Sequence, residues 1–396
     1  MKGDPQPAAT QRILIVRPSA LGDVCRTVPV LATLRQALPH AEIDWLVQDS
    51  FIEAIEAHPA LTAAVPFPRG HFAKWWRSPG TSLEIIRWVL EIRRSRYDTV
   101  YDLQGLSRSG AITRFTGAGR RVGFRDAREL GWLGYNVRHP APRSRHIVDQ
   151  MLELMEREGF QPLRDMRLYS PARAAAWWNV ERARHGLSES GSYAVLAPTS
   201  RWKSKRWPID RWAALVDPLL ARGFDRVVII GGPDERAQVG PLVDRPHPHV
   251  ITVVGGTSVG QTMAIIEQAG LVIANDSAPL HMAVGFDRPA LGLFGPTDPV
   301  RVGPYTRGGA GGNCAVISAA APEGAKRLNF RDAALGDSLM RTIRPAHVVE
   351  QIEAVFAKSE QTRAAERNIL ERPSPGAAGT DASTAHGLAP APTRSR

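Results

Sequence analysis

Short apolar runs alternate along the first half of the chain with segments whose apolar residues recur at helical spacing. The first run, residues 12–17 (RILIVR), has the β-branched character of a strand buried inside a parallel sheet. In residues 23–38 the apolar positions fall on one stripe of a helix. Further runs that predict strands lie at residues 42–47, 63–66 and 99–103, and a further helical segment lies at residues 83–94. This order is typical of a doubly wound α/β sheet.

The alternation begins again after residue 191. Apolar runs predict strands at residues 193–197, 226–230, 250–254, 271–274 and 289–294, and helical spacing predicts helices at residues 209–222 and 261–268. Residues 164–191 are expected to hold the connection between the halves and a helix around residues 177–185. Two Rossmann-like units in succession place a crevice between them, at the carboxyl ends of their strands.

These patterns divide the chain into an N-terminal domain (residues 1–170), a C-terminal domain (171–357) and a tail (358–396). A closing helix is expected at residues 346–356, either ending the second domain or packing back on the first. The tail is dominated by Ala, Pro, Gly, Ser, Thr and charged residues, so it cannot bury enough apolar surface to become ordered. We therefore predict that it is disordered.

The composition excludes several classes of protein. No run of 18 apolar residues is present, which argues against a transmembrane helix, and the first ten residues lack the pattern of a signal peptide. The two cysteines, Cys25 and Cys314, are too few for a disulfide framework or a cysteine-rich metal site. The sequence thus predicts a soluble protein of a reducing cytoplasm.

Positive charge is concentrated in the first domain. The net charge is +11, and residues 69–145 hold sixteen Lys or Arg against six Asp or Glu. Such a field attracts nucleic acid, an anionic membrane surface or an acidic substrate, although a solvated Arg-rich surface is the alternative. No nucleic-acid-binding motif or aromatic platform accompanies the basic residues, so a nucleic-acid partner is not expected.

The loop after the first strand, residues 18–24, carries a carboxylate at the start of a helix. It has one glycine where a dinucleotide site needs three, so pyrophosphate binding there is not expected. Asp23 has two interpretations. It caps its helix, or it takes a proton from an attacking hydroxyl in the crevice.

The end of the strand at residues 193–197 is followed by two hydroxyls, Thr199 and Ser200, and then by a run of cations that includes Lys205. Hydroxyls, an ammonium group and helix amides at a strand's carboxyl end form a natural diphosphate cradle. The alternative is a basic surface loop.

Two other strand ends carry polar residues. Residues 231–235 (GGPDE) place Glu235 beyond a glycine turn, a pattern that is also common in ordinary helix starts. Residues 274–281 (ANDSAPLH) place several amide donors before a helix, with His281 about one turn inside it. A lone helical histidine is more often structural, so both interpretations of His281 remain open.

Four of these segments resemble, in order and spacing, the family 9 glycosyltransferases, the heptosyltransferases that build the inner core of lipopolysaccharide. They are residues 17–24 (RPSALGDV), 205–208 (KRWP), 275–281 (NDSAPLH) and 293–298 (LFGPTD). The resemblance runs from about residue 13 to residue 356. It implies a GT-B fold, in which an N-terminal acceptor domain and a C-terminal nucleotide-sugar domain face each other across a cleft.

The resemblance also implies an inverting transfer with no cofactor and no metal ion. The family's usual donor is ADP-L-glycero-β-D-manno-heptose, and its acceptor is a Kdo or heptose residue of the growing core. The expected partners are therefore a nucleotide sugar, an anionic glycolipid and the cytoplasmic face of the inner membrane, where the enzyme would be peripheral.

By this resemblance Asp23 is the general base. The positions that match donor-binding residues are Thr199, Ser200, Lys205, Glu235, Asp276, Ser277, Ala278 and His281, with Asp234 a near alternative to Glu235. The positions expected to meet the acceptor are Arg17, Ser19 and Arg120. The chain departs from the family pattern at Ala278 and Pro279, where a glycine is usual, and a proline has no amide to offer a phosphate.

Three alternatives to a heptosyltransferase are open on the sequence. One is a family relative that transfers another nucleotide-activated sugar, and another is a sugar-nucleotide epimerase on the same two-domain plan. The third is a non-catalytic binder of nucleotide sugars. The presence of Asp23 together with Lys205 and Asp276 argues against the last.

Overall fold

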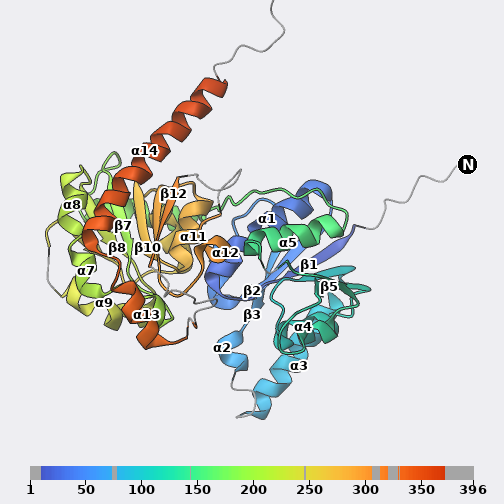
Figure 1. Cartoon of the computed structure of the whole chain (residues 1–396). Helices are drawn as coiled ribbons and strands as arrows, with labels where there is room; N and C mark the ends of the chain where they lie inside the picture. The colour runs from blue at the N-terminus through green and yellow to red at the C-terminus, as the bar shows by residue number, and fades with distance from the viewer. Residues whose placement is uncertain are drawn as a thin grey trace, which may run out of the picture.

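The computed structural model describes residues 10–73, 78–142, 144–244, 247–305, 313–319, 329 and 331–370. Two six-stranded sheets, each with helices packed on it, form the two halves of the molecule (Figure 1). Every strand pair is parallel. The predicted α/β class, with two Rossmann-like units in succession, is therefore confirmed.

The N-terminal sheet has the strand order β3-β2-β1-β4-β5-β6. Its strands are β1 (Arg12–Val16), β2 (Glu42–Gln48), β3 (Ala63–Phe67), β4 (Thr99–Asp102), β5 (Arg120–Phe124) and β6 (Val137–His139). The helices and 3-10 turns of this half are α1 (Leu21–Ala37), η1 (Asp49–Ala54), α2 (Arg69–Phe72), α3 (Pro79–Arg94), α4 (Ser107–Phe115), η3 (Gly131–Gly134) and α5 (Ile147–Arg157). The order reverses between β1 and β4, which places a crevice at the carboxyl ends of these two strands.

The C-terminal sheet repeats this plan with the order β12-β11-β10-β7-β8-β9. Its strands are β7 (Tyr193–Ala197), β8 (Arg226–Ile229), β9 (Val250–Thr252), β10 (Leu271–Asn275), β11 (Ala290–Phe294) and β12 (Cys314–Ser318). Its helices and turns are α6 (Ala172–Arg184), η4 (Lys203–Lys205), α7 (Ile209–Ala213), α8 (Val216–Ala221), η5 (Pro233–Glu235), α9 (Arg236–Val243), α10 (Val259–Glu267), α11 (Ala278–Gly285), α12 (Pro299–Val302), α13 (Ala333–Met340) and α14 (Pro345–Leu370).

The central strands are covered on both faces, which explains their continuous apolar runs. Each residue of β7, β10 and β11 is buried. A strand with helices on both sides has no solvent face, so it gains nothing from alternating polar residues. The largest fully buried side chains include four tryptophans, Trp45, Trp178, Trp207 and Trp212.

The chain passes from one half to the other between α5 and α6. α5 packs on α1 of the first half, and α6 packs on α10 of the second. The backbone N–H of Leu168 donates to the carbonyl of Gly285 at 3.0 Å, which ties the connecting segment to α11. This crossing encloses the predicted boundary at residues 170 and 171.

The last helix takes the first of its two predicted placements, and it is longer than predicted. It packs beside β11 and β12 through Val348, Ile352 and Val355, within the C-terminal core, rather than back on the first half (Figure 1). It also continues to Leu370, beyond the predicted end of the domain at residue 357. The remainder of the predicted tail, residues 371–396, lies outside the described residues.

A membrane-spanning helix was not expected, and no helix within the described ranges combines the length and apolar character needed to cross a bilayer.

Three glycines allow α4 to lie directly against η3. A Cβ on Gly110 would stand 2.2 Å from the carbonyl oxygen of Gly131, and one on Gly134 would stand 2.1 Å from the carbonyl oxygen of Gly110. We expect Gly110→Ala to lower the free energy of unfolding by ~1–3 kcal/mol, because backbone must move to admit the methyl group. Alanine's better helix propensity returns only about 1 kcal/mol of this. Urea unfolding measures the change.

Gly119→Ala is the matched control for that substitution, because nothing lies within 4 Å of a Cβ at Gly119. The control should unfold at the same urea concentration as the parent protein. Equal stability of Gly110→Ala and the parent would mean that α4 and η3 are less closely packed than described.

Candidate active site

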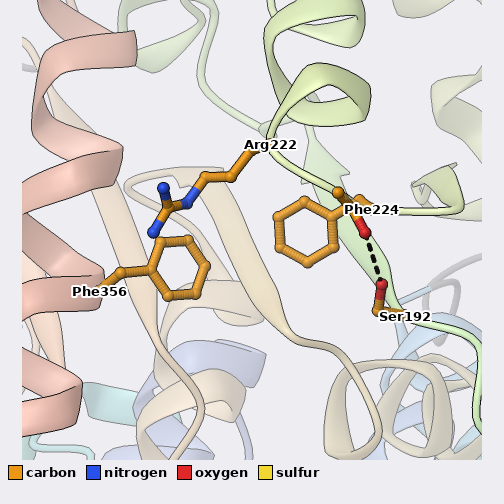
Figure 2. A pocket seen from close by; sticks show the side chains of 5 residues that line it. Ser192, Arg222, Phe224 and Phe356 are labelled. Atoms are coloured by element: carbon orange, nitrogen blue, oxygen red, sulfur yellow. Dashed lines mark hydrogen bonds between the residues drawn. The ribbon is translucent and has the colours of Figure 1, made fainter.

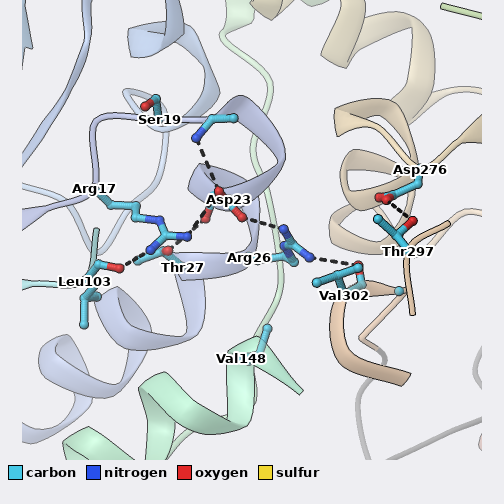
Figure 3. Close-up of polar contacts among 12 residues, drawn as sticks. Arg17, Ser19, Asp23, Arg26, Thr27, Leu103, Val148, Asp276, Thr297 and Val302 are labelled. Atoms are coloured by element: carbon cyan, nitrogen blue, oxygen red, sulfur yellow. Dashed lines mark hydrogen bonds and ion pairs between the residues drawn. The ribbon is translucent and has the colours of Figure 1, made fainter. Parts of the chain in front are cut away.

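Asp23 lies in the first turn of α1, at the switch point of the N-terminal sheet. The N-cap of α1 is Ala20, so Asp23 helps to cap the helix from its third position, through the return bond of a capping box, and not as the N-cap residue. Its carboxylate does accept the N–H of Ala20, at 3.4 Å. The same carboxylate pairs with two guanidinium groups, those of Arg17 at 3.2 Å and Arg26 (Figure 3). About a quarter of its side chain, 26%, remains exposed.

The positive charges of these two arginines keep the carboxyl group of Asp23 ionised. Burial by itself raises the pKa of this carboxyl, but the charges of Arg17 and Arg26 outweigh it and hold the pKa well below its usual range. Asp23 is therefore ionised at neutral pH. Arg17 is fixed in turn because it donates to the carbonyl of Leu103, just beyond β4 (Figure 3).

A second polar cluster lies at the carboxyl ends of β7, β10 and β11. The Nζ of Lys205 lies 2.6 Å from Oδ2 of Asp276, and the hydroxyl of Thr297 donates to the same oxygen at 2.7 Å. Both charged side chains are mostly covered, with 16% of Lys205 and 6% of Asp276 exposed. An ion pair this sheltered from water fixes Lys205 in one orientation.

Asn275 holds the loop that carries Lys205. Its side-chain amide donates to the carbonyl of Pro198 at 2.7 Å, and its Oδ1 accepts the N–H of Trp207 at 3.1 Å. The loop is thereby fixed at both ends to the last residue of β10. Thr199 and Ser200 are buried within this loop, and the carbonyl of Ser200 accepts a bond from Arg206 at 2.7 Å.

The start of α11 lies beside these residues. Ser277 is its N-cap, Ala278 is its first residue and Pro279 stands in its first turn. Within the described structure no side chain caps this helix end, but the N–H of Leu280 donates to the carbonyl of Ser277 at 3.2 Å, so only part of the first turn's N–H groups are available to an anion. Pro279 removes one of these donors, although proline is favourable in a first helical turn.

The two clusters face each other where α1 meets α11. A Cβ placed on Gly22 would lie 3.0 Å from Cδ2 of His281 and 3.5 Å from Cα of Ala278. Arg26 also crosses between the halves, since its guanidinium donates to the carbonyl of Val302 at 2.8 Å (Figure 3). Asp23, in α1 of the N-terminal half, is therefore brought close to the polar cluster of the C-terminal half.

His281 is buried between the halves, with 2% of its surface exposed. Burial lowers its pKa well below the ordinary value, and the charge of Arg26 lowers it further. The charges of Asp23 and Lys205 also act on this ring, which places it between the two clusters. The imidazole is therefore neutral at pH 7.

We expect the His281 ring to take up its proton only well below pH 6.5, because burial lowers its pKa. Because the unfolded chain takes up this proton near pH 6.5 and the folded chain does not, the stability contributed by His281 is lost as the pH falls through 6.5. NMR of ¹³C-labelled histidine, with His281→Gln to identify the signal, measures the titration. A midpoint near 6.5 would contradict the burial of this ring.

Of the other predicted site residues, Ser19 and Glu235 lie near the crevice, whereas Arg120 does not. Ser19 lies near the clusters, in the loop before Asp23, and its N–H donates to the side chain of Gln104 at 3.2 Å. Glu235 lies directly after β8, at the same sheet edge as Thr199, and its carboxylate accepts the N–H of Gly232 at 2.8 Å.

Arg120 is not brought to the site, contrary to its predicted role with the acceptor. It is the first residue of β5, and the crevice lies at the carboxyl ends of these parallel strands. Its guanidinium instead forms two bonds with the carboxylate of Glu158, at 2.8 and 2.9 Å.

A hollow of about 270 Å³ lies elsewhere, at the amino ends of β7 and β8. It is lined by Ser192, Arg222, Gly223, Phe224 and Phe356 (Figure 2). The guanidinium of Arg222 lies 4.4 Å from the ring centre of Phe356, and the hydroxyl of Ser192 donates to the carbonyl of Gly223. None of the predicted site residues lines this hollow, so we do not assign it to the reaction.

The model of glycosyltransferase family 9 (heptosyltransferase) matches residues 85–323, more than half of the chain. The chain belongs to glycosyltransferase family 9. The resemblance read from four sequence segments is thus confirmed, and the protein is a glycosyltransferase. Its two facing sheets have the GT-B arrangement of the heptosyltransferases described below.

Lipopolysaccharide heptosyltransferase 1 of Escherichia coli K12 is 28% identical over 301 residues, which cover 74% of this chain and 91% of the relative. Lipopolysaccharide heptosyltransferase 2 of the same strain is 26% identical over 369 residues, covering 88% and 99%. The solved structure of the E. coli heptosyltransferase WaaC with ADP has a TM-score of 0.69 and 26% identity, covering 87% of this chain and all of that one.

Sequence reasoning missed three residues that shape the site. Arg26 stands one helical turn after Asp23, and an acidic and a basic residue at that spacing are a detectable pair. Thr297 and Asn275 stand within segments that carried the resemblance, yet neither received a role.

Within the described residues no group of three or more His, Cys, Asp or Glu could hold a metal ion.

Proposed function

We propose that this glycosyltransferase transfers a heptose from ADP-heptose to a Kdo or heptose residue of the lipopolysaccharide inner core. The transfer inverts the anomeric carbon and uses no metal ion or cofactor. Similarity along most of the chain to lipopolysaccharide heptosyltransferases 1 and 2 supports heptose transfer to lipopolysaccharide. The WaaC structure with ADP supports the adenine nucleotide.

One observation supports the reaction type most directly. An ionised carboxylate, that of Asp23, and a sheltered ammonium group, that of Lys205, belong to opposite halves of the molecule, and the charges of both act on the buried ring of His281. A single displacement needs a base on one side of the anomeric carbon and stabilisation of the leaving diphosphate on the other. The two halves supply one group each.

On the acceptor side, Asp23 accepts the proton of the attacking hydroxyl as the new glycosidic bond forms. Its low pKa makes it a weak base. This suits a displacement in which the anomeric carbon already carries oxocarbenium character when the hydroxyl arrives, because the proton then becomes acidic late in the step. Arg17 and Arg26 keep the carboxylate charged and oriented.

On the donor side, the bond between the anomeric carbon and the diphosphate oxygen breaks, and negative charge develops on that oxygen. Lys205 and the first amides of α11 meet this charge without reorganisation, since Asp276 and Asn275 already fix their positions. In this proposal the carboxylate of Asp276 also accepts hydrogen bonds from hydroxyl groups of the heptose.

The acceptor is an anionic glycolipid, so the enzyme works as a peripheral protein at the cytoplasmic membrane face. The excess of basic residues between positions 69 and 145 favours such a surface. Arg17 and Ser19 lie on the acceptor side of the crevice.

Calorimetric binding of ADP, UDP and GDP, with EDTA and then with Mg²⁺, tests the donor. We expect ADP to bind with equal affinity in both conditions. A transfer assay with ADP-heptose and Kdo-lipid A then tests the reaction, and NMR of the product's anomeric proton tests inversion. Preference for UDP or GDP would discard the heptose donor, and strict dependence on Mg²⁺ would discard the metal-free mechanism.

A further inference from the structure

Helix α3 carries a stripe of exposed apolar side chains. Leu83, Ile86 and Leu90 are 47%, 55% and 44% exposed. Because they are separated by three and four residues, they share one side of the helix. Thr81 and Ile92, on the opposite side, are buried against the domain. The stripe therefore points directly away from the protein.

The orientation of α3 is fixed from its inner side. The indole N–H of Trp88 donates to the carbonyl of Pro66 at 3.0 Å. Its ring lies 5.5 Å from the ring of Phe67 and 5.5 Å from that of Phe72, measured between centres. A helix held by these contacts does not rotate to hide its outer stripe, so the exposure belongs to the fold.

Charge is distributed unevenly around this stripe. At 3.6 residues per turn, Arg87 and Arg94 project next to the apolar residues, whereas Glu84 and Glu91 lie further round the helix. Glu84 is moreover paired with His71 of α2. A flat surface laid on the stripe would thus meet two guanidinium groups before any carboxylate.

Further exposed apolar side chains lie in the same part of the chain as the stripe. Among the described residues, nine large hydrophobic side chains are exposed, and six of them lie between positions 83 and 133. The six are Leu83, Ile86, Leu90, Phe115, Leu130 and Leu133. The same part of the chain holds the excess of Lys and Arg, so apolar and basic groups occur together here.

This region adjoins the mouth of the crevice. α2 and α3 follow β3 at the carboxyl edge of its sheet, and they project from the lower edge of the N-terminal half (Figure 1). Arg69, the first residue of α2, donates to the hydroxyl of Ser19 at 3.3 Å, in the loop that leads to Asp23. A surface that touched α3 would therefore lie beside the acceptor side of the site.

We propose that α3 docks the enzyme on an anionic phospholipid bilayer. Leu83, Ile86 and Leu90 enter the headgroup region, and Arg87 and Arg94 pair with lipid phosphates. A second copy of the chain fits less well, because a twofold contact through this stripe would bring the same arginines together. The inference rests on the proposed function only in taking the acceptor to be a membrane glycolipid.

Co-sedimentation with vesicles tests the docking surface. Vesicles of phosphatidylglycerol and phosphatidylcholine, without any glycolipid, should bind the full chain, and vesicles of phosphatidylcholine alone should bind it more weakly. The triple variant Leu83→Ser, Ile86→Ser, Leu90→Ser should lose about tenfold in affinity for the anionic vesicles. The variant Arg87→Gln, Arg94→Gln should lose affinity for the anionic vesicles alone.

The matched control replaces exposed apolar residues elsewhere, as Val180→Ser with Val300→Ser, which are 55% and 73% exposed in the parent. This control should bind vesicles like the parent. Equal ADP binding by the triple variant shows that its fold is intact.

Vesicle binding by the triple variant equal to that of the parent would overturn the proposal. So would a parent dimer that the triple variant dissociates while its vesicle binding is unchanged, because α3 would then be a protein interface. No sugar nucleotide enters this assay. If vesicle binding depends on α3 but ADP-heptose is not a substrate, the proposed function fails and the docking surface stands.

Discussion

Asp23→Asn should lower turnover by ~10²–10⁴-fold and leave ADP affinity nearly unchanged. The amide keeps the size of the side chain and still accepts the N–H of Ala20, but it cannot take a proton from the attacking hydroxyl. In the proposed mechanism ADP binds to groups on the other half of the molecule, so its affinity should not depend on this carboxylate. Steady-state transfer rates and calorimetry measure the two effects separately.

The pH dependence of the parent enzyme's activity also tests the role of Asp23. Because Arg17 and Arg26 hold the pKa of this carboxyl well below 3.8, activity should not fall on its account between pH 8 and pH 5. An acid limb with a midpoint between 5 and 6 would require another group.

A structural role for Asp23 must be distinguished from a catalytic one, since its loss also leaves Arg17 and Arg26 without their partner. Asp149→Asn is the control. Asp149 is likewise a carboxylate in the first turn of a helix, and it accepts the hydroxyl of Tyr305 across the halves at 2.7 Å. This variant should keep turnover within a few-fold. Equal losses in both variants would make Asp23 a residue that positions the halves.

Lys205→Met should weaken ADP binding and lower turnover together, by ~10²–10³-fold in turnover. Lys205 meets the diphosphate both when the donor binds and when it leaves, so its removal affects both stages. Unchanged ADP affinity in this variant would remove Lys205 from the donor site.

The same substitution destabilises the fold, and a double variant separates the two effects. Breaking a buried pair by removing one partner costs about 3–5 kcal/mol, because Asp276 keeps an uncompensated charge. In Lys205→Met with Asp276→Asn that charge is gone. Stability should therefore largely return, whereas ADP affinity and turnover should not. Recovery of activity in the double variant would mean that Lys205 acts only by neutralising Asp276.

Of the twelve strands in the described residues the sequence predicted nine, and it missed β5, β6 and β12, which are only partly buried. Strands covered on both faces are apolar at every position, so runs such as residues 271–274 stand out without any knowledge of their neighbours. Helix ends were harder. The segment 209–222 was predicted as one helix but forms α7 and α8, because Pro218 has no N–H to donate to the carbonyl of residue 214.

From the sequence, the site residues that could be predicted were those that follow the end of a strand. Asp276 directly follows β10 and Lys205 lies in the loop after β7, and they come together because parallel strands end at one edge. Arg120 starts a strand, and only the family resemblance had assigned it to the acceptor. The bridge from Arg26 to Val302 joins residues far apart in sequence, and no local pattern indicates which buried arginine crosses to the other half.

The close approach at Gly22 bears on how the enzyme opens. At one point where α1 meets α11, Gly22 presents no side chain, and the other helix presents the edge of the His281 ring. No side chain interlocks at this point, so it offers little resistance to one helix sliding along the other. Small sliding movements of packed helices are one of the two common routes by which domains part around a ligand. The contact at Gly22 is thus suited to a shear movement between the halves.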